Sequence, residues 1–222
     1  MPGVFITFEG TEGSGKSTQI SLLAARLRAK DFIVRTFREP GGTPIGEEIR
    51  HTLKHSSKNQ AMEPATELLL MNASRAQLVR ELIRPALAAD EIVLCDRFYD
   101  STVAYQGFGR QLDTHFVDAV IDFAVGDTRP ELTFLMTIPI EVSEERRNAR
   151  QRTLPFMRDR IEEGDRTFFE RVAKGYQCIA ESEPARVRAI NGVGSIETIS
   201  AEIWKQVAPV LEVRYFGSRK ET

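Results

Sequence analysis

Cysteine is scarce in this chain: among its 222 residues only Cys95 and Cys178 are cysteines, and they lie far apart. Neither belongs to a C-x-x-C pair, and no histidine lies near them. The sequence therefore lacks the spacing of a metal site or of a disulfide framework. We expect two buried thiols in a protein of a reducing compartment.

Long apolar runs and net charge are also lacking. No apolar stretch approaches the roughly 18 residues of a membrane-spanning helix, and the chain enters a predicted strand at once. The 30 Lys and Arg residues nearly balance the 32 Asp and Glu residues, which leaves a formal net charge of −2 and no long polybasic tract. This composition argues against a nucleic-acid or anionic-membrane surface. We expect a cytoplasmic protein with small-molecule partners.

Short apolar runs alternate with longer helical patterns along the whole chain. We predict strands at Val4–Phe8, Phe32–Phe37, Ile92–Cys95, Leu132–Ile138 and Val187–Ile190, and helices at Lys16–Arg28, Pro44–Leu53, Glu67–Leu87, Thr114–Ala124, Val142–Arg152, Arg166–Ala180 and Ile196–Leu211. Apolar strands joined by crossover helices predict an α/β fold with a three-layer, doubly wound, five-stranded parallel sheet. We expect one domain over residues 1–213, with a loose polar tail at 214–222.

The most informative motif follows the first predicted strand. Residues 10–17 fit the pattern G-x-x-x-x-G-K-[ST] of a phosphate-binding loop. Glycines permit the positive φ angles that turn backbone N–H groups toward a polyphosphate, and the next helix directs its positive dipole end there. A plain glycine-rich turn is the alternative, but the strand before and the helix after favour ATP binding. The residues concerned are Gly10, Thr11, Glu12, Gly13, Ser14, Gly15, Lys16, Ser17 and Thr18.

Within this motif, Lys16 is expected to reach the β- and γ-phosphates and the Ser17 hydroxyl to ligate Mg²⁺. Asp96, which ends the third predicted strand, occupies the place where phosphate-loop enzymes put the carboxylate that orients Mg²⁺. A helix cap is the alternative for Asp96 taken alone. Arg97 adds a forked cation that binds phosphate bidentately, which indicates an enzyme with an acceptor phosphate.

Arginine is concentrated farther along the chain. Four arginines lie within residues 146–152, and residues 158–162 read Arg-Asp-Arg-Ile-Glu. A solvated helix face is the ordinary interpretation of such a cluster. A basic lid is the functional one, because phosphoryl transfer spreads negative charge over oxygens that an arriving arginine neutralises. We place this short mobile lid at residues 151–164.

Several strings in sequence order resemble bacterial thymidylate kinases. They are Phe8-Glu9-Gly10, the phosphate loop, Arg38-Glu39-Pro40-Gly41-Gly42-Thr43-Pro44, Ala73-Ser74-Arg75, Asp96-Arg97-Phe98, Ser101-Thr102-Val103-Ala104-Tyr105-Gln106-Gly107 and Asp159-Arg160-Ile161-Glu162. The resemblance implies a P-loop kinase fold and the reaction of ATP with dTMP to give ADP and dTDP, with Mg²⁺ and usually in a homodimer. It covers the chain from about Phe5 to Tyr176.

The resemblance also implies roles for individual residues. Arg75 matches the donor to thymine O4, Thr102 faces the N3 edge of the base with Gln106 nearby, and Tyr105 excludes a 2′-hydroxyl. Glu12 approaches the 3′-hydroxyl, Arg97 clamps the acceptor phosphate, and the lid supplies Arg150 and Arg152 as catalytic arginines beside Lys16. The full implied dTMP site is Glu12, Arg38, Glu39, Met71, Arg75, Arg97, Ser101, Thr102, Tyr105 and Gln106.

Met71 departs from the family pattern, which has an aromatic residue one helical turn before Arg75. Its thioether can still present a polarisable contact to a base, or it is a core residue of an amphipathic helix. Two rival functions stay open at this point. A GTP-dependent switch would need an N-K-x-D guanine motif, which the sequence lacks, and a different nucleoside or nucleoside monophosphate kinase would share the loop and the lid.

Overall fold

The structure is a computed structural model that describes residues 3–153, 159–161 and 163–216, with only the backbone described for residues 150, 151 and 153. The predicted lid and tail therefore lie partly outside the described residues. No helix in the described part of the chain is long and apolar enough to cross a membrane.

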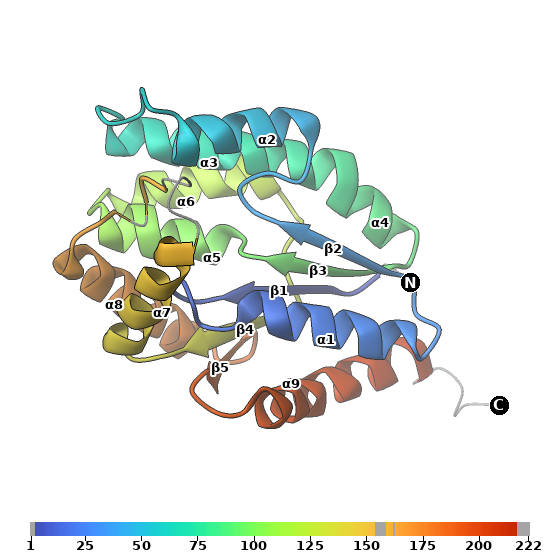
Figure 1. Cartoon of the computed structure of the whole chain (residues 1–222). Coiled ribbons are helices and arrows are strands. Elements are labelled where there is room, and N and C mark those ends of the chain that lie inside the picture. The colour runs from blue at the N-terminus through green and yellow to red at the C-terminus, as the bar shows by residue number, and fades with distance from the viewer. Residues whose placement is uncertain (1–2, 154–158, 162, 217–222) are drawn as a thin grey trace.

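Five parallel strands form one sheet in the order β2-β3-β1-β4-β5, which confirms the predicted fold class (Figure 1). The strands are β1 Phe5–Glu9, β2 Val34–Arg38, β3 Ile92–Asp96, β4 Leu132–Thr137 and β5 Val187–Asn191. Strand β1 lies between β3 and β4, so its carboxyl end is at the centre of the sheet edge. Ligands of doubly wound sheets bind beyond this edge.

Helices cover both faces of the sheet. They are α1 Lys16–Arg28, α2 Pro44–Arg50, α3 Pro64–Leu78, α4 Arg84–Ala88, α5 Tyr99–Thr102, α6 Thr114–Val125, α7 Ile140–Thr153, α8 Arg166–Ser182 and α9 Ile196–Leu211, with π-helical segments η1 His51–His55, η2 Val79–Ile83, η3 Val103–Gly109 and η4 Glu212–Phe216. The predicted helix Glu67–Leu87 is thus one helical stretch interrupted by a π-turn.

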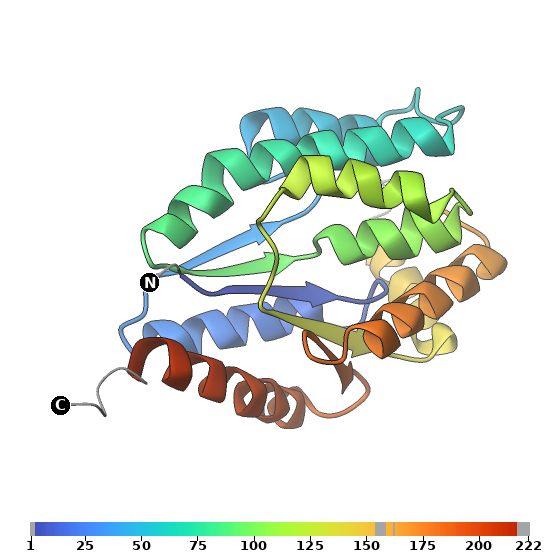
Figure 2. The ribbon, with the colours of Figure 1, turned by 180° about the vertical axis from the view of Figure 1, so that it is seen from behind.

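Helices lie on both sides of the sheet and make three layers (Figures 1 and 2), and apolar side chains fill the space between the sheet and each helical layer. Alternate residues of β1, such as Ile6 and Phe8, pack with α1 and α9 on one face. Phe5 packs on the opposite face with α3, α4 and α6, and a third cluster joins η3 to α8 there. The three central strands β1, β3 and β4 are buried on both faces, which explains why they read as continuous apolar runs, whereas the edge strands β2 and β5 are partly exposed.

Three expectations need correction. The stretch Tyr99–Gly109 is helical although the sequence pattern predicts no helix there, because buried contacts of Ala104 and Tyr105 with α8 override its β-branched residues and glycines. The chain is not loose directly after Val213, because η4 continues α9 and Tyr215 packs against Phe32. Of the two free thiols, Cys95 is buried but Cys178 is only half-buried.

Candidate functional site

The loop between β1 and α1 has the backbone that the motif predicts. Gly10, Gly13 and Gly15 have φ values of 128°, 76° and 96°. A Cβ atom on Gly10 would lie 2.3 Å from the backbone oxygen of Met136 in β4, so this position has neither the φ nor the space for a side chain. The loop is therefore pressed against the sheet edge, with its N–H groups available at the start of α1.

Lys16 lies inside this loop and is only 6% exposed. Its Nζ donates hydrogen bonds to the backbone oxygens of Gly10 (3.0 Å) and Thr11 (2.9 Å), and lies 3.4 Å from Ser14 Oγ. Burial lowers the pKa of Lys16 to about 8, because the ammonium is taken from water, and nearby Arg97 acts in the same direction. A bound polyphosphate would supply the negative charge that this ammonium lacks.

Ser17 and Asp96 meet because β1 and β3 are neighbours. The register pairs Phe8 with Asp96, so the end of β3 lies beside the loop that leaves β1. Ser17 Oγ donates a 2.7 Å hydrogen bond to Asp96 Oδ2. A hydroxyl and a carboxylate are oxygen ligands of the kind that Mg²⁺ takes, directly or through water. In the described residues no cluster of three or more His, Cys, Asp or Glu side chains could hold a metal by itself, so these two oxygens fit a magnesium that also binds phosphates and water.

Arg97 has a left-handed backbone conformation, with a φ of 70°. Such strain in a non-glycine residue is held by its surroundings and is common at functional sites. Its guanidinium donates to Ser101 Oγ (3.0 Å) and Tyr176 Oη (3.1 Å), and it lies 3.6 Å from a Glu12 carboxylate oxygen and over the ring of Tyr105. The side chain is thereby oriented before any ligand arrives.

Glu9 is a site residue that the sequence reasoning missed. It accepts hydrogen bonds from Phe98 N (2.7 Å), Ser101 Oγ (2.6 Å) and Tyr176 Oη (2.9 Å). Burial, with a smaller effect of Asp100, raises the pKa of Glu9 to about 7 against the opposing effect of Arg97. Its place at the end of an apolar strand was the available signal, the same one that identified Asp96.

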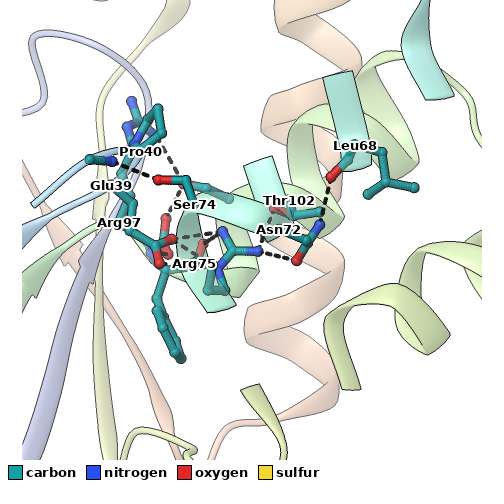
Figure 3. Close-up of polar contacts among 12 residues, drawn as sticks. Glu39, Pro40, Leu68, Asn72, Ser74, Arg75, Arg97 and Thr102 are labelled. Carbon is teal, nitrogen blue, oxygen red and sulfur yellow. Dashed lines mark hydrogen bonds and ion pairs between the residues drawn. The ribbon is translucent and has the colours of Figure 1, made fainter. Parts of the chain in front are cut away.

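Arg75 is the centre of a buried polar cluster (Figure 3). Its five N–H groups donate to Glu39, Asn72, Thr102 and the backbone oxygen of Phe98, with the shortest Glu39 contact at 2.7 Å. Burial raises the pKa of Glu39 even though Arg75 opposes this shift. Because all five donors of Arg75 have protein partners, a direct contact with O4 of a pyrimidine requires exchange of one of these bonds.

A pocket opens beside this cluster and has an empty volume of about 580 Å³, part of it open to solvent. It contains nine of the ten residues of the implied dTMP site, all except Arg38. Its apolar wall comes from Met71, Tyr105, Ile161 and Phe169, of which the last two were not foreseen. An apolar slot with a few polar groups is typical of a site for a planar ring.

A second, more polar cavity extends from the first to the phosphate loop. The two share Glu12, Glu39, Lys54 and Arg97, so a ligand in one can reach a ligand in the other. The predicted residues Arg38, Asp96 and Thr18 also line the second cavity. Arg38 donates to Glu47 and to the backbone oxygen of Pro40.

Arg50 and Lys54 were missed as lining residues of the second cavity. They follow one another at a four-residue spacing across the junction of α2 and η1, so they lie on one face of the helical stretch. Lys54 pairs with Asp159 at 2.5 Å. This pairing connects the Asp159-Arg160-Ile161 string of the predicted lid to a residue of both cavities, and Asp159 and Ile161 themselves line the first cavity.

The arginine cluster lies on α7. Arg146 donates a 2.7 Å hydrogen bond to the backbone oxygen of Gly13, so it contacts the phosphate loop directly. Arg147 lies over the ring of Phe169, with 4.4 Å between its Cζ and the ring centroid. Arg152 is exposed, and the side chain of Arg150 lies outside the described residues. The geometry therefore adds Arg146 to the arginines to consider on the donor side.

Comparison with known proteins gives one consistent result. A sequence model of the family described as thymidylate kinase matches residues 8–203. A thymidylate kinase of Pseudomonas syringae pv. tomato is 46% identical over 214 residues, which cover 96% of this chain and 99% of that protein. One of Thermomicrobium roseum is 43% identical over 208 residues, with coverages of 94% and 96%.

A solved structure agrees with the sequence matches. The crystal structure of thymidylate kinase from Ehrlichia chaffeensis has a TM-score of 0.74 and 32% identity, and the match covers 93% of this chain and 99% of that one. With a family model matched along most of its length and relatives of this similarity, the chain belongs to the thymidylate kinase family.

Proposed function

We propose that ATP, held with Mg²⁺ on the phosphate loop, is the phosphoryl donor for the conversion of dTMP to dTDP that thymidylate kinases perform for dTTP synthesis. The observation that supports this most is the continuity of the two cavities, one lined by the phosphate loop and the other by the apolar slot. A donor phosphate and an acceptor phosphate would meet at Arg97, Glu12 and Lys54, which line both. We also propose a cytoplasmic location, in agreement with two unpaired cysteines.

The reaction in this site needs no general base. The acceptor is a phosphate oxygen that is already anionic at neutral pH, so the enzyme has to align the reactants and neutralise charge. Lys16 contacts the β- and γ-phosphates. Ser17 and Asp96 would hold Mg²⁺, which neutralises further phosphate charge when bound. Arg97 holds the acceptor phosphate in line with the donor.

On the acceptor side, the base would enter the slot beside Met71 and Phe169, with Thr102 and Gln106 at its polar edge. Tyr105 is fixed near Arg97 by a 3.4 Å contact between its hydroxyl and a guanidinium nitrogen. As the family resemblance implies, we propose that this ring leaves no room for a 2′-hydroxyl and so selects deoxyribose by steric exclusion.

On the donor side, we propose that Arg150, near the end of α7, and Arg152, at the start of the lid, arrive as the transition state forms. Support comes from helix α7, which carries both residues and contacts the phosphate loop through Arg146 and Gly13. Closure would also exclude water, which otherwise accepts the phosphoryl group in place of dTMP.

The magnesium assignment is tested with Asp96→Asn. The amide keeps an oxygen that can accept the Ser17 hydrogen bond, but the substitution removes the negative charge that would orient the metal. We expect the Mg²⁺ concentration for half-maximal rate to rise by about tenfold or more, and activity to disappear with a chelator. Asp127→Asn, at a surface position paired with Arg84, is the matched control and should change nothing. An unaltered Mg²⁺ dependence of Asp96→Asn would contradict the assignment.

The base slot is tested with Met71→Phe. Met71 is half-buried, packs on the η3–α8 cluster and also lines the slot. If the base lies against it, an aromatic ring should retain or strengthen dTMP binding, because stacking on a base contributes about 1–3 kcal/mol. If Met71 is only core, the larger ring should lower stability by about 1–3 kcal/mol through overpacking.

Thermal melting with and without dTMP separates these outcomes. Leu22→Phe is the control, since Leu22 is 38% exposed on α1, away from the slot and from the apolar face of α3 and α6. A lower melting temperature of Met71→Phe with unchanged dTMP affinity would mean that the base lies elsewhere in the slot. Phe169 would then be the next residue to test as its stacking partner.

A homodimer is proposed from an exposed apolar face on α3 and α6. Phe123 is 81% exposed, Phe116 is 67% exposed seven residues earlier on the same helical face, and Leu69 lies on the adjacent α3. Contiguous exposed aromatic residues of this size are typical of association surfaces. The second copy of the chain is the partner that the family resemblance implies.

We expect Phe123→Asp to shift the protein toward the monomer mass of 25.0 kDa in light scattering. A charge in the middle of an apolar interface leaves an unpaired, desolvated group in the dimer. Val213→Asp, which also introduces a charge at an exposed position but on the segment after α9, should leave the mass unchanged. If Phe123→Asp has the same mass as the unaltered protein, this face is not the interface.

A further inference from the structure

A buried carboxylate lies behind the proposed base slot and has no role in the mechanism above. Glu67 is in the first turn of α3, and its side chain is only 1% exposed. It accepts hydrogen bonds from the side chains of Gln106, Arg110 and Arg160. Buried charges persist in proteins when they are paired and hydrogen-bonded in this way, so Glu67 is a fixed group against which its neighbours are oriented.

The contact with Gln106 determines which end of that amide faces the slot. Gln106 Nε2 donates a 2.7 Å hydrogen bond to Glu67 Oε1. A carboxylate has only acceptors, so the NH₂ end of the amide must be the end that faces it. Gln106 lines the slot, and within the described part of the chain its Oε1 accepts no hydrogen bond. The acceptor end is therefore left for a ligand.

Glu67 itself is held from the other side. Arg110 donates to both of its oxygens, at 3.2 and 3.1 Å, and Arg160 of the lid string donates to Oε2. Arg110 is in turn packed over the ring of Phe168, with 4.5 Å between its Cζ and the ring centroid. Two guanidinium groups that can only donate keep Glu67 in the acceptor role toward Gln106.

The orientation matters because the two ends of an amide have nearly the same shape but opposite hydrogen-bonding character. Thymine carries a hydrogen on N3, whereas N3 of cytosine carries a lone pair at the same place. An amide oxygen at the polar edge of the slot matches thymine, and an NH₂ group at that position would match cytosine. A site whose buried polar groups are mismatched with a ligand rejects it strongly.

We propose that Glu67 is a positioning residue for base selection, which holds the amide oxygen of Gln106 toward the slot and so favours a pyrimidine with a hydrogen on N3. The proposal rests on the assignment of this slot to the base of dTMP. It assigns part of the discrimination between dTMP and dCMP to a residue that does not line the slot.

The test compares the ratio of kcat/KM for dTMP to that for dCMP among variants. In Glu67→Gln the amide of Gln106 is free to turn, and we expect the ratio to fall by at least about tenfold. Gln106→Leu should lower the ratio by itself. In the Gln106→Leu background, Glu67→Gln should lower it no further than about twofold, because a residue that acts through Gln106 has nothing left to orient.

Arg110→Gln is the matched control, because it removes another partner of Glu67 but not the contact with Gln106. It should lower the melting temperature and leave the ratio within about twofold of the unaltered enzyme. Glu67→Asp provides a second variant if Glu67→Gln does not fold. It keeps the charge for both arginines but is one methylene shorter, so the ratio should fall here too.

Two results would overturn the proposal in distinguishable ways. If Gln106→Leu lowers the ratio but both Glu67 variants leave it unchanged, Glu67 has only a structural role. If Gln106→Leu itself leaves the ratio unchanged, the base does not lie against Gln106, and the slot assignment fails together with the proposal. Neither result contradicts the phosphorylation of dTMP by the unaltered enzyme, which is the proposed function.

Discussion

Lys16→Ala is expected to lower kcat by at least about 100-fold while the protein remains folded. Lys16 is the one ammonium enclosed by the phosphate loop among the described residues, with three contacts to the loop. A preorganised charge aimed at the transferred phosphate contributes about 3 kcal/mol or more to lowering the barrier. Burial inside the loop, with a smaller effect of Arg97, lowers the pKa of Lys16 to about 8, although Asp96 and Glu12 oppose this shift.

Single-turnover kinetics with saturating ATP and dTMP measure this effect directly. Lys205→Ala, at an exposed position on α9, is the matched control and should retain full activity. Circular dichroism and melting of Lys16→Ala should resemble those of the unaltered protein, because the hydrogen bonds lost are within one loop. Turnover within threefold of the unaltered enzyme in a folded Lys16→Ala protein would remove the phosphate loop from the mechanism.

Arg97→Ala is expected to lower kcat/KM for dTMP by about 100-fold or more and to change ATP affinity little. The guanidinium lies where the two cavities join and is oriented by Ser101 and Tyr176 before a ligand arrives. Removing one partner of a largely desolvated charge pair typically costs about 2–5 kcal/mol, and here the partner left unpaired would be the acceptor phosphate. Arg97→Lys keeps the positive charge but loses the paired N–H donors that bind a phosphate bidentately, so its effect should be intermediate.

Equilibrium binding of dTMP and of ATP to each Arg97 variant decides the assignment. The pKa of Glu9, which is buried beside Arg97, provides a second measurement. Loss of the Arg97 charge removes an effect that lowers the pKa of Glu9, so this pKa should rise above its value of about 7. If Arg97→Ala instead weakens ATP binding and spares dTMP, the donor and acceptor sites are inverted.

Much of the fold follows from sequence pattern because the three central strands are buried on both faces. All five were predicted from apolar runs, and the boundaries of α1 and α9 agree with the predicted ones to the residue. The phosphate loop was predictable for a local reason: three glycines must have positive φ within six residues, and they do. Asp96 was predictable from the strand that it ends.

Other parts of the site depend on contacts between distant segments and have no local signal. The helical stretch of Thr102 to Gln106 forms because α8 covers it, not because its residues favour a helix. Apart from Asn72 on the same helix, the partners of Arg75 come from the loop after β2 and from the segment Phe98–Thr102, so the sequence could indicate its importance but not that all its donors are occupied. Glu67 belongs to none of the sequence motifs, and its partners Gln106, Arg110 and Arg160 come together around it only in the folded structure.

The most direct test of the account is phosphoryl transfer from ATP and Mg²⁺ to a panel of nucleoside monophosphates, measured as kcat/KM for each acceptor. The two joined cavities predict that dTMP is converted to dTDP at least about 100-fold more efficiently than dCMP, dGMP or AMP, and that no diphosphate forms without Mg²⁺. A higher kcat/KM for another monophosphate, or hydrolysis of ATP at the same rate with and without dTMP, would contradict it.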